Sequence, residues 1–355
     1  MDTIKIRANL KNFKRGISNG NLSIGFAGGS ITTASNSENW PTHLRGWLVS
    51  AFPNVHFRIN NAAIGATGSL CGLALAQKEF IDSKYDLVFI EYAVNDHSID
   101  REERMRTREG LIRKLMAADI DVVLVYTYFS EMYDNELPQS IADFEQLAKH
   151  YKISSVNMAK PVYNMVSDGM MPINMWLPDG THPQAFGSYL YASEVIRFLK
   201  AELAREDYTP LHCGGLPEPL NTKNWQTFRE ISLDSVHTKG AWSIEKERAL
   251  SWFDEKLYSC AFNASVSFPF SGRGIALIFN YGKTSGMIEY RIDSGEWKKY
   301  AFERYWWVPE ENFVNSVKFA DDLTVGEHLF EMRVSYVNQK DFTSCTCGIL
   351  KIMVI

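Results

Sequence analysis

A serine, a histidine and an aspartate in this sequence have the types and spacing that nucleophilic chemistry needs. Ser30 ends the run Ile24-Gly-Phe-Ala-Gly-Gly-Ser30, where two glycines allow the backbone to turn tightly. A hydroxyl attacks a carbonyl only when a neighbouring base takes its proton. Asp179-Gly-Thr-His182 offers an imidazole, with a carboxylate three positions earlier that can fix its tautomer. These residues predict acyl transfer through a serine nucleophile.

Each part of this set has a plainer interpretation. Ser30 could be only the N-cap of a helix, and a second pair with the same spacing occurs at Asp234-Ser-Val-His237. Context favours His182, because Pro183 and a predicted helix over 184–204 follow it and close the first part of the chain. His237 lies in a later part that is rich in predicted strands, where a surface turn or strand pair is the expected role.

Acyl transfer also needs donors for the oxygen that becomes negative. Gly65, in the loop Asn60-Asn-Ala-Ala-Ile-Gly-Ala66, is small enough for its backbone N–H to approach a substrate. Asn95, in Glu91-Tyr-Ala-Val-Asn-Asp96, carries a side-chain amide. Taken singly, Gly65 could only relieve a turn, and Asn95 or Asp96 could only cap the helix that follows them.

These residues share one relation to the elements that must position them, since Ser30, Gly65 and Asn95 each follow a predicted strand. Strands that alternate with helices predict a doubly wound parallel sheet, in which ligands bind beyond the carboxyl ends of the strands. The apolar runs and amphipathic segments predict strands at 23–27, 55–59, 86–92 and 121–126, and helices at 40–52, 69–81, 101–118 and 138–151.

The order of these segments resembles the SGNH hydrolase superfamily of GDSL esterases and lipases, over about residues 20 to 205. The four matching blocks are Gly28-Gly-Ser-Ile-Thr32, Gly65, Val94-Asn-Asp96 and Asp179-Gly-Thr-His-Pro183. The resemblance implies a flavodoxin-like α/β fold and a Ser-His-Asp mechanism that needs no metal or cofactor. In it Ser30 would be the nucleophile, His182 the base and then the acid, and Asp179 its orienting partner. The N–H groups of Ser30 and Gly65, with the Asn95 amide, would form the oxyanion hole.

Two positions depart from the family pattern. Gly29 stands where the first block often has Asp, and Ala93 stands where the third often has Gly. Neither position carries a proton in the mechanism, so we expect both to affect loop shape and substrate. The fold also hosts acyltransferases, in which a sugar hydroxyl replaces water.

The pattern changes after Glu206, where Pro210, Gly214, Gly215, Pro217 and Pro219 crowd one short stretch. We therefore predict a hydrolase domain over 1–208 and a second domain over 209–355. Short β-branched and aromatic runs in the second domain predict an antiparallel, jelly-roll-like β-sandwich. The predicted strands are 260–270, 274–281, 287–292, 316–319, 326–337 and 348–355.

Aromatic residues bear on the substrate. The second domain holds six of the nine Trp residues, among them Trp297, Trp306 and Trp307, for which sugar binding and core or interdomain packing both stay open. Trp40 and Trp176 lie near the motif blocks in sequence and are candidates to line the substrate site. The arrangement resembles bacterial carbohydrate esterases, so we expect hydrolysis of O-acetyl or other short acyl esters of a carbohydrate.

Three alternatives remain open. The first is a lipid esterase or thioesterase, which the lack of a long apolar lid segment disfavours. The second is a sugar O-acyltransferase, and the third is a carbohydrate-binding protein without catalysis.

Composition excludes other classes. The 355 residues carry a formal net charge of −5, with no basic patch that would indicate nucleic-acid binding. No apolar run is long enough for a membrane span, and no signal peptide is visible. This predicts a cytoplasmic protein, or a secreted or periplasmic one if a signal was removed. An oligomer remains an option.

The five cysteines predict free thiols rather than a zinc site. The mixed charges of 101–109 predict a solvated helix face.

Overall fold

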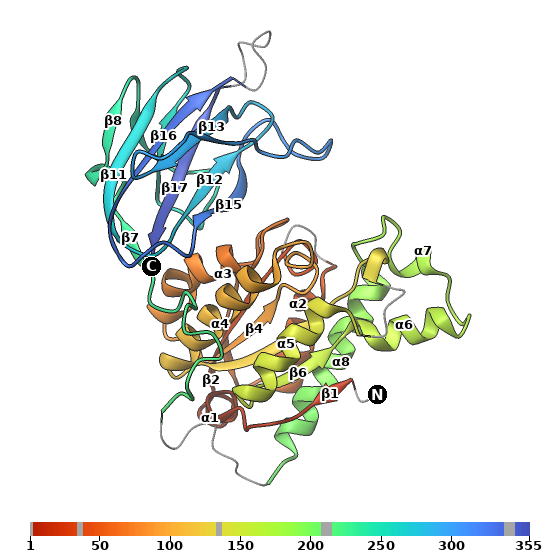
Figure 1. The fold of residues 1–355 in the computed structure, drawn as a ribbon. Coiled ribbons are helices and arrows are strands. Elements are labelled where there is room, and N and C mark those ends of the chain that lie inside the picture. The colour runs from red at the N-terminus through yellow and green to blue at the C-terminus, as the bar shows by residue number, and fades with distance from the viewer. Residues whose placement is uncertain (1–2, 34–37, 133–136, 207–214, 337–344) are drawn as a thin grey trace. The chain divides into compact units, whose positions relative to one another are not determined.

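The chain forms two compact units, Met1–Gln226 and Thr227–Ile355. The computed structural model describes residues 3–33, 38–132, 137–206, 215–336 and 345–355 (Figure 1). The domain boundary predicted between residues 208 and 209 lies outside the described residues, as does Cys213. Cys71, Cys260, Cys345 and Cys347 are free thiols.

The first unit is built on a six-stranded sheet with the order β1-β6-β5-β4-β2-β3. Strands β2 to β6 are parallel, and only the short β1 pairs antiparallel with its neighbour β6. The strands are β1 (Ile4–Lys5), β2 (Asn21–Gly28), β3 (His56–Asn61), β4 (Leu87–Glu91), β5 (Asp121–Tyr126) and β6 (Ser154–Asn157).

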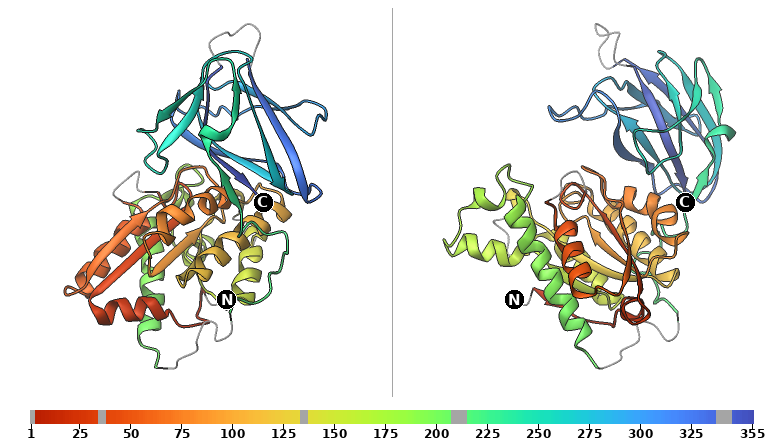
Figure 2. Two further views of the ribbon diagram at one scale, coloured as in Figure 1. Left: turned by 90° about the vertical axis from the view of Figure 1, so that its left-hand side faces the viewer. Right: turned by 180° about the vertical axis from the view of Figure 1, so that it is seen from behind.

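Helices cover both faces of this sheet, with α2 and α8 on one face and α3, α4 and α5 on the other (Figures 1 and 2). The helices are α1 (Lys11–Asn19), α2 (Trp40–Ala51), α3 (Ser69–Ala76), α4 (Arg101–Ala117), α5 (Gln139–His150), α6 (Ala159–Ser167), α7 (Ile173–Trp176) and α8 (Ala185–Leu203). Short turns of other helix types lie at Gln77–Ile81, Ser130–Met132 and Leu233–Ser235.

The predicted doubly wound α/β fold is confirmed, and its topology determines where a site can form. Strand β2 lies between β3, which follows it in sequence, and β4, which comes later. From β2 the chain goes first to β3 on one side of that strand and then to β4 on its other side. This reversal of direction opens a crevice at the carboxyl ends of β2 and β4. Ser30 follows β2 and Asn95 follows β4, so both lie at this crevice.

The second unit consists of two antiparallel sheets, with strand orders β15-β12-β17-β10-β9 and β14-β13-β16-β11-β8, and β7 pairs with β17. One apolar core contains residues of both sheets, among them Phe279 and Ile352 of the first and Phe268 and Phe330 of the second. This confirms the predicted β-sandwich. The strands are β7 (Arg229–Ile231), β8 (His237–Lys239), β9 (Ser243–Lys246), β10 (Glu255–Ser259), β11 (Ser265–Gly272), β12 (Ile275–Tyr281), β13 (Met287–Ile292), β14 (Lys298–Tyr300), β15 (Phe313–Ala320), β16 (Gly326–Ser335) and β17 (Cys347–Val354).

The prediction that residues 101–109 form a solvated face is wrong. Arg108 and Glu109 of α4 are both 0% exposed. Arg108 pairs with Asp96 at 2.7 Å and donates to the Ser140 carbonyl, while Glu109 accepts from the backbone N–H groups of Leu220 and Asn221. Because each charge finds partners on other segments, α4 can bury a face that its own sequence marks as polar.

No helix among the described residues has both the length and the apolar character needed to span a bilayer.

Candidate active site

Ser30, His182 and Asp179 form a continuous chain of hydrogen bonds. Ser30 Oγ lies 2.7 Å from His182 Nε2, and His182 Nδ1 lies 2.7 Å from Asp179 Oδ2. An imidazole protonated on Nδ1 donates to Asp179 and accepts from the Ser30 hydroxyl. This is the arrangement in which a histidine can remove a serine proton.

A tight turn after β2 presents Ser30. The N–H groups of Thr32 and Thr33 both donate to the Gly29 carbonyl, at 3.1 and 3.0 Å. No helix begins at Ser30, because α2 starts only at Trp40 and takes its side-chain cap from Asn39. The N-cap interpretation of Ser30 therefore has no support in the structure.

A buried carboxylate lies beneath this turn. Glu91, the last residue of β4, is 0% exposed and accepts hydrogen bonds from the hydroxyls of Thr127 and Thr32 and from the Gly29 N–H. Burial raises the pKa of Glu91, although these three hydrogen bonds oppose the shift. Glu91 thus connects the residues on either side of Ser30 to the ends of β4 and β5.

The loop before α8 holds the histidine. Asp179 Oδ1 accepts from the N–H groups of Thr181 and His182, at 2.9 and 2.7 Å, which closes a local turn. Gly180 has φ +83°, which favours glycine, and its carbonyl accepts from the Ser130 N–H. Asp179 therefore shapes the loop with one oxygen and contacts the imidazole with the other.

The histidine and its carboxylate are open to solvent. The side chains of His182 and Asp179 are 46% and 55% exposed. Burial by itself would raise the pKa of Asp179, but hydrogen bonds from His182 and Thr181 outweigh it, so the pKa lies below its ordinary value. A cavity of about 590 Å³ lies beside both side chains, and Glu38, Gln184 and Ala185 are also in its lining. A site of this kind admits an ester carried on a large molecule.

The candidate oxyanion donors lie at the same edge of the sheet. The loop that carries Gly65 is joined to β2, because the Ile64 N–H donates to the Gly28 carbonyl at 3.0 Å. The Asn95 side chain lies against Gly29, where an added Cβ would come within 1.8 Å of Asn95 Oδ1. The structure thus brings the Gly65 and Asn95 segments to the Ser30 turn, and the role of these donors in catalysis stays a prediction.

The same contact favours glycine at position 29. An aspartate at position 29 would collide with Asn95 in its present position.

The residue after Asn95 is firmly anchored. Asp96 is 0% exposed, pairs with Arg108 and accepts from the Ser69 N–H at the start of α3. Asp96 does not cap the helix that follows it, because the side-chain cap of α4 is Asp100. Because Asp96 is held on two sides, the adjacent Asn95 has a well-defined backbone position.

The structure corrects the prediction for two tryptophans. Trp40 and Trp176 are both 0% exposed, so neither indole is available to line a substrate site. Trp40 Nε1 donates to Thr32 Oγ1 and Trp176 Nε1 donates to the Tyr191 hydroxyl. Each therefore supports a loop of the site from the core, one on the serine side and one on the histidine side.

The rival pair and a metal site find no support. Asp234 accepts from the Ser232 hydroxyl, while His237 lies on β8, and no hydrogen bond joins the two. Within the described ranges, no group of three or more His, Cys, Asp or Glu side chains is placed to hold a metal ion.

Sequence reasoning missed Glu91, Thr32 and Arg108 as supports of the site. Glu91 had one usable signal, since it is an acidic residue that closes the otherwise apolar strand Leu87-Val-Phe-Ile-Glu91. Thr32 and Arg108 had none, because their partners lie on segments that only the fold brings together.

Comparison with known proteins identifies the fold. No protein-family model and no curated protein matches the chain. A crystal structure of a two-domain esterase active on acetylated mannans matches with a TM-score of 0.85 and 23% identity, covering 99% of this chain and 97% of that one. A crystal structure of such an esterase with mannopentaose gives a TM-score of 0.83 and 23% identity, covering 99% of this chain and 96% of that one. This chain therefore shares, over almost its entire length, the fold of a two-domain esterase.

Proposed function

We propose that this protein is a serine esterase that removes acetyl or other short acyl groups from a carbohydrate. The observation that carries the proposal is the chain of two 2.7 Å contacts from Ser30 through His182 to Asp179. The open cavity beside His182 and the fold shared with an esterase active on acetylated mannans support the carbohydrate substrate.

The first half of the reaction forms an acyl-enzyme. Ser30 Oγ attacks the ester carbonyl while His182 Nε2 takes its proton, and the Asp179 carboxylate stabilises the resulting imidazolium. The N–H groups of Ser30 and Gly65 and the Asn95 amide donate to the oxyanion. The tetrahedral intermediate then collapses, the carbonyl–sugar oxygen bond breaks, and His182 returns the proton to the departing sugar hydroxyl.

The second half releases the acid. Water attacks the acyl group on Ser30 while His182 takes a proton from that water. Collapse of the second intermediate breaks the bond to Ser30 Oγ, which recovers its proton from His182. In an acyltransferase a sugar hydroxyl would take the place of this water.

Acetate release from a panel of acetylated glycans, including mannan and xylan, tests the proposal with Ser30→Ala as control. We expect the wild type to release acetate from at least one glycan, and the variant to lose activity by about 10³-fold or more. In a series of p-nitrophenyl esters, acetate should react faster than octanoate. Faster hydrolysis of octanoate would instead support a lipid esterase, and sugar esters formed in place of acetate would indicate an acyltransferase. Unchanged activity in Ser30→Ala would refute the mechanism.

A further inference from the structure

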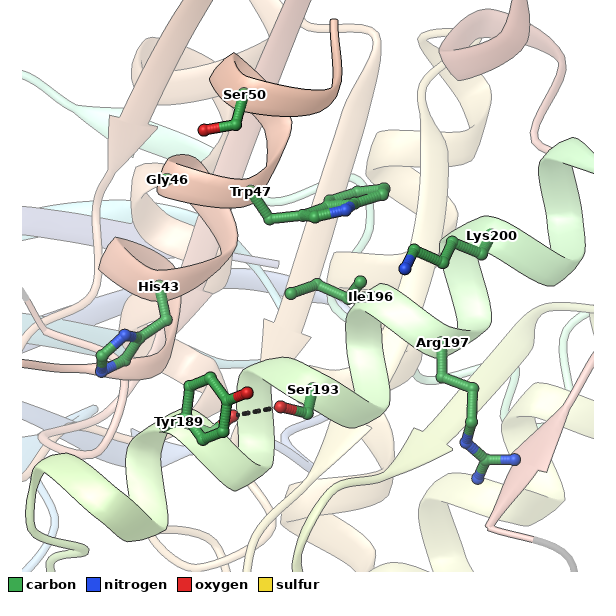
Figure 3. A pocket seen from close by; sticks show the side chains of 9 residues that line it. All are labelled: His43, Gly46, Trp47, Ser50, Tyr189, Ser193, Ile196, Arg197 and Lys200. Atoms are coloured by element: carbon green, nitrogen blue, oxygen red, sulfur yellow. Dashed lines mark hydrogen bonds between the residues drawn. The ribbon is translucent and has the colours of Figure 1, made fainter.

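A groove lies between α2 and α8, the two helices that begin beside the cavity next to His182. Its volume is about 580 Å³, and Figure 3 shows the nine residues that line it. The cavity beside His182 is lined by Glu38, just before α2, and by Gln184 and Ala185, at the start of α8. The groove is lined by later turns of the same two helices, so the helices that begin at the site also form its walls.

Two aromatic rings from opposite walls face this groove. The Trp47 indole extends from α2 into the space between the helices, and the Lys200 amine points toward it (Figure 3), with its nitrogen 5.9 Å from the ring centroid. Tyr189 of α8 is 53% exposed and meets the His43 ring edge-on at 5.9 Å. Neighbouring side chains therefore hold both rings in place, while part of the surface of each ring remains exposed.

Apart from Ile196, the other side chains of the lining are polar, and few of them carry a free charge. Ser50 is exposed, and the Ser193 hydroxyl donates to the Tyr189 carbonyl. Arg197 is engaged by Glu194 and Thr3, which leaves Lys200 as the main cation facing the groove. An acyl chain would need a continuous apolar lining, and a polyanion would need several unpaired cations. Two rings with hydroxyl and ammonium donors fit a neutral sugar chain better than either.

We propose that the α2–α8 groove binds the sugar units next to the one whose ester is at Ser30, so that it selects polymeric over small substrates. This proposal rests on the proposed carbohydrate esterase function. From His43 to Ser50 the α2 wall is about 10 Å long, at ~1.5 Å per helical residue. A chain bound there would continue from the catalytic cavity without leaving the first unit.

Gly46 allows the groove to be blocked without disturbing the core. It lies in α2 and lines the groove, and a Cβ added there would meet no atom within 4 Å. Gly46→Arg should also favour the helix, since glycine is a poor helix former. Val49→Arg is the matched control, because Val49 is 53% exposed on the same helix and does not line the groove. Trp47→Ala removes the indole instead of filling the space.

Steady-state kinetics on p-nitrophenyl acetate and on acetylated oligosaccharides of increasing length test this proposal. We expect Gly46→Arg and Trp47→Ala to leave p-nitrophenyl acetate hydrolysis unchanged and to raise KM for the long oligosaccharides about tenfold. Val49→Arg should match the wild type on both. If Trp47→Ala fails to fold, Gly46→Arg still decides the outcome.

Gly46→Arg with the wild-type KM at every length would overturn the groove proposal and leave the esterase proposal intact. Equal losses in Gly46→Arg and Val49→Arg would overturn it too. If the wild type cleaves p-nitrophenyl acetate but no acetylated glycan, the carbohydrate function itself fails, and the groove proposal fails with it.

Discussion

Asp179 has two roles at the candidate site, and each of its two carboxylate oxygens performs one of them. Oδ1 accepts the backbone N–H groups that shape the loop, and Oδ2 contacts His182 Nδ1. Since the pKa of Asp179 lies below its ordinary value, the group remains a carboxylate throughout the neutral range. It can therefore stabilise a positive imidazole at any pH where the enzyme would work.

Replacing Asp179 with asparagine separates these tasks. The amide oxygen can still accept the N–H groups of Thr181 and His182, but the side chain no longer carries charge beside the imidazole. We expect Asp179→Asn to fold normally and to lower kcat by about 10²-fold or more. Melting temperature and p-nitrophenyl acetate turnover measure the two effects. Asp234→Asn is the control, because Asp234 belongs to the other pair with this spacing, and an equal loss there would contradict the assignment.

At the residue scale the sequence was informative about chemistry and poor about orientation. Ser30, His182 and Asp179 were predicted from types and spacing, and the structure brings them together. Trp40 and Trp176 were misassigned, because proximity to a motif in sequence does not reveal whether a side chain points to the core or to the surface.

At the scale of elements, helix α1 depends on a distant carboxylate. Its N-cap residue, Leu10, provides no side-chain cap, but Asp121 at the start of β5 accepts from the N–H groups of Asn12 and Phe13 at 2.7 and 2.9 Å. Burial raises the pKa of Asp121 to about 7, against the effect of these hydrogen bonds, and Asp119 and Asp86 add to the rise. A buried acid therefore links α1 to the sheet.

This raised pKa predicts a pH dependence of stability. Between the ordinary value of 3.8 and about 7 the folded state keeps a proton that the unfolded state has released. The contribution of Asp121 to the free energy of unfolding is therefore complete below about pH 4 and is lost as the pH rises toward 7. Compared with Asp121→Asn, the wild type should lose unfolding free energy over this range by at most about 1.4 kcal/mol per pH unit.

Urea unfolding at several pH values measures this difference, and Asp82→Asn is the control because Asp82 is exposed and is not among the groups that shift the pKa of Asp121. A difference between wild type and Asp121→Asn that stays constant from pH 4 to 7 would contradict the prediction.

The sequence predicted long apolar elements and missed polar ones. The predicted strand at 121–126 coincides with β5, whose six residues are all buried. Strand β6, with the sequence Ser-Ser-Val-Asn, has no apolar pattern and is defined by pairing with β5 and β1. Helix α4 shows the opposite failure, because its buried charges gave the pattern of an exposed helix. In both cases the deciding partners belong to other segments.

At the scale of the whole molecule, the first unit extends to Gln226, past the stretch rich in Pro and Gly. Trp225 is 0% exposed, and its backbone N–H donates to the Arg106 carbonyl of α4. Glu109, also buried, accepts the N–H groups of Leu220 and Asn221. Composition indicated a break because prolines and glycines mark irregular backbone, but irregular backbone can still be part of a core.

This attachment predicts how the first unit tolerates shortening. A chain that ends at residue 208 would leave the Glu109 carboxylate without two of its donors and would lose the Trp225 side chain. We expect it to be less stable than a chain that ends at Gln226 by roughly 3–5 kcal/mol. Urea denaturation of the two chains measures the difference, and equal midpoints would contradict this account of the boundary.

The central claim is that Ser30 and His182 act together as nucleophile and base, and covalent labelling tests it most directly. The protein is treated with a fluorophosphonate, and peptide mass mapping locates the adduct and measures its rate of formation. The account predicts one adduct, on Ser30, that forms at the wild-type rate in His237→Ala and at least about 10²-fold more slowly in His182→Ala. An enzyme that hydrolyses esters while Ser30 stays unlabelled, or that loses its labelling rate in His237→Ala instead, would contradict the account.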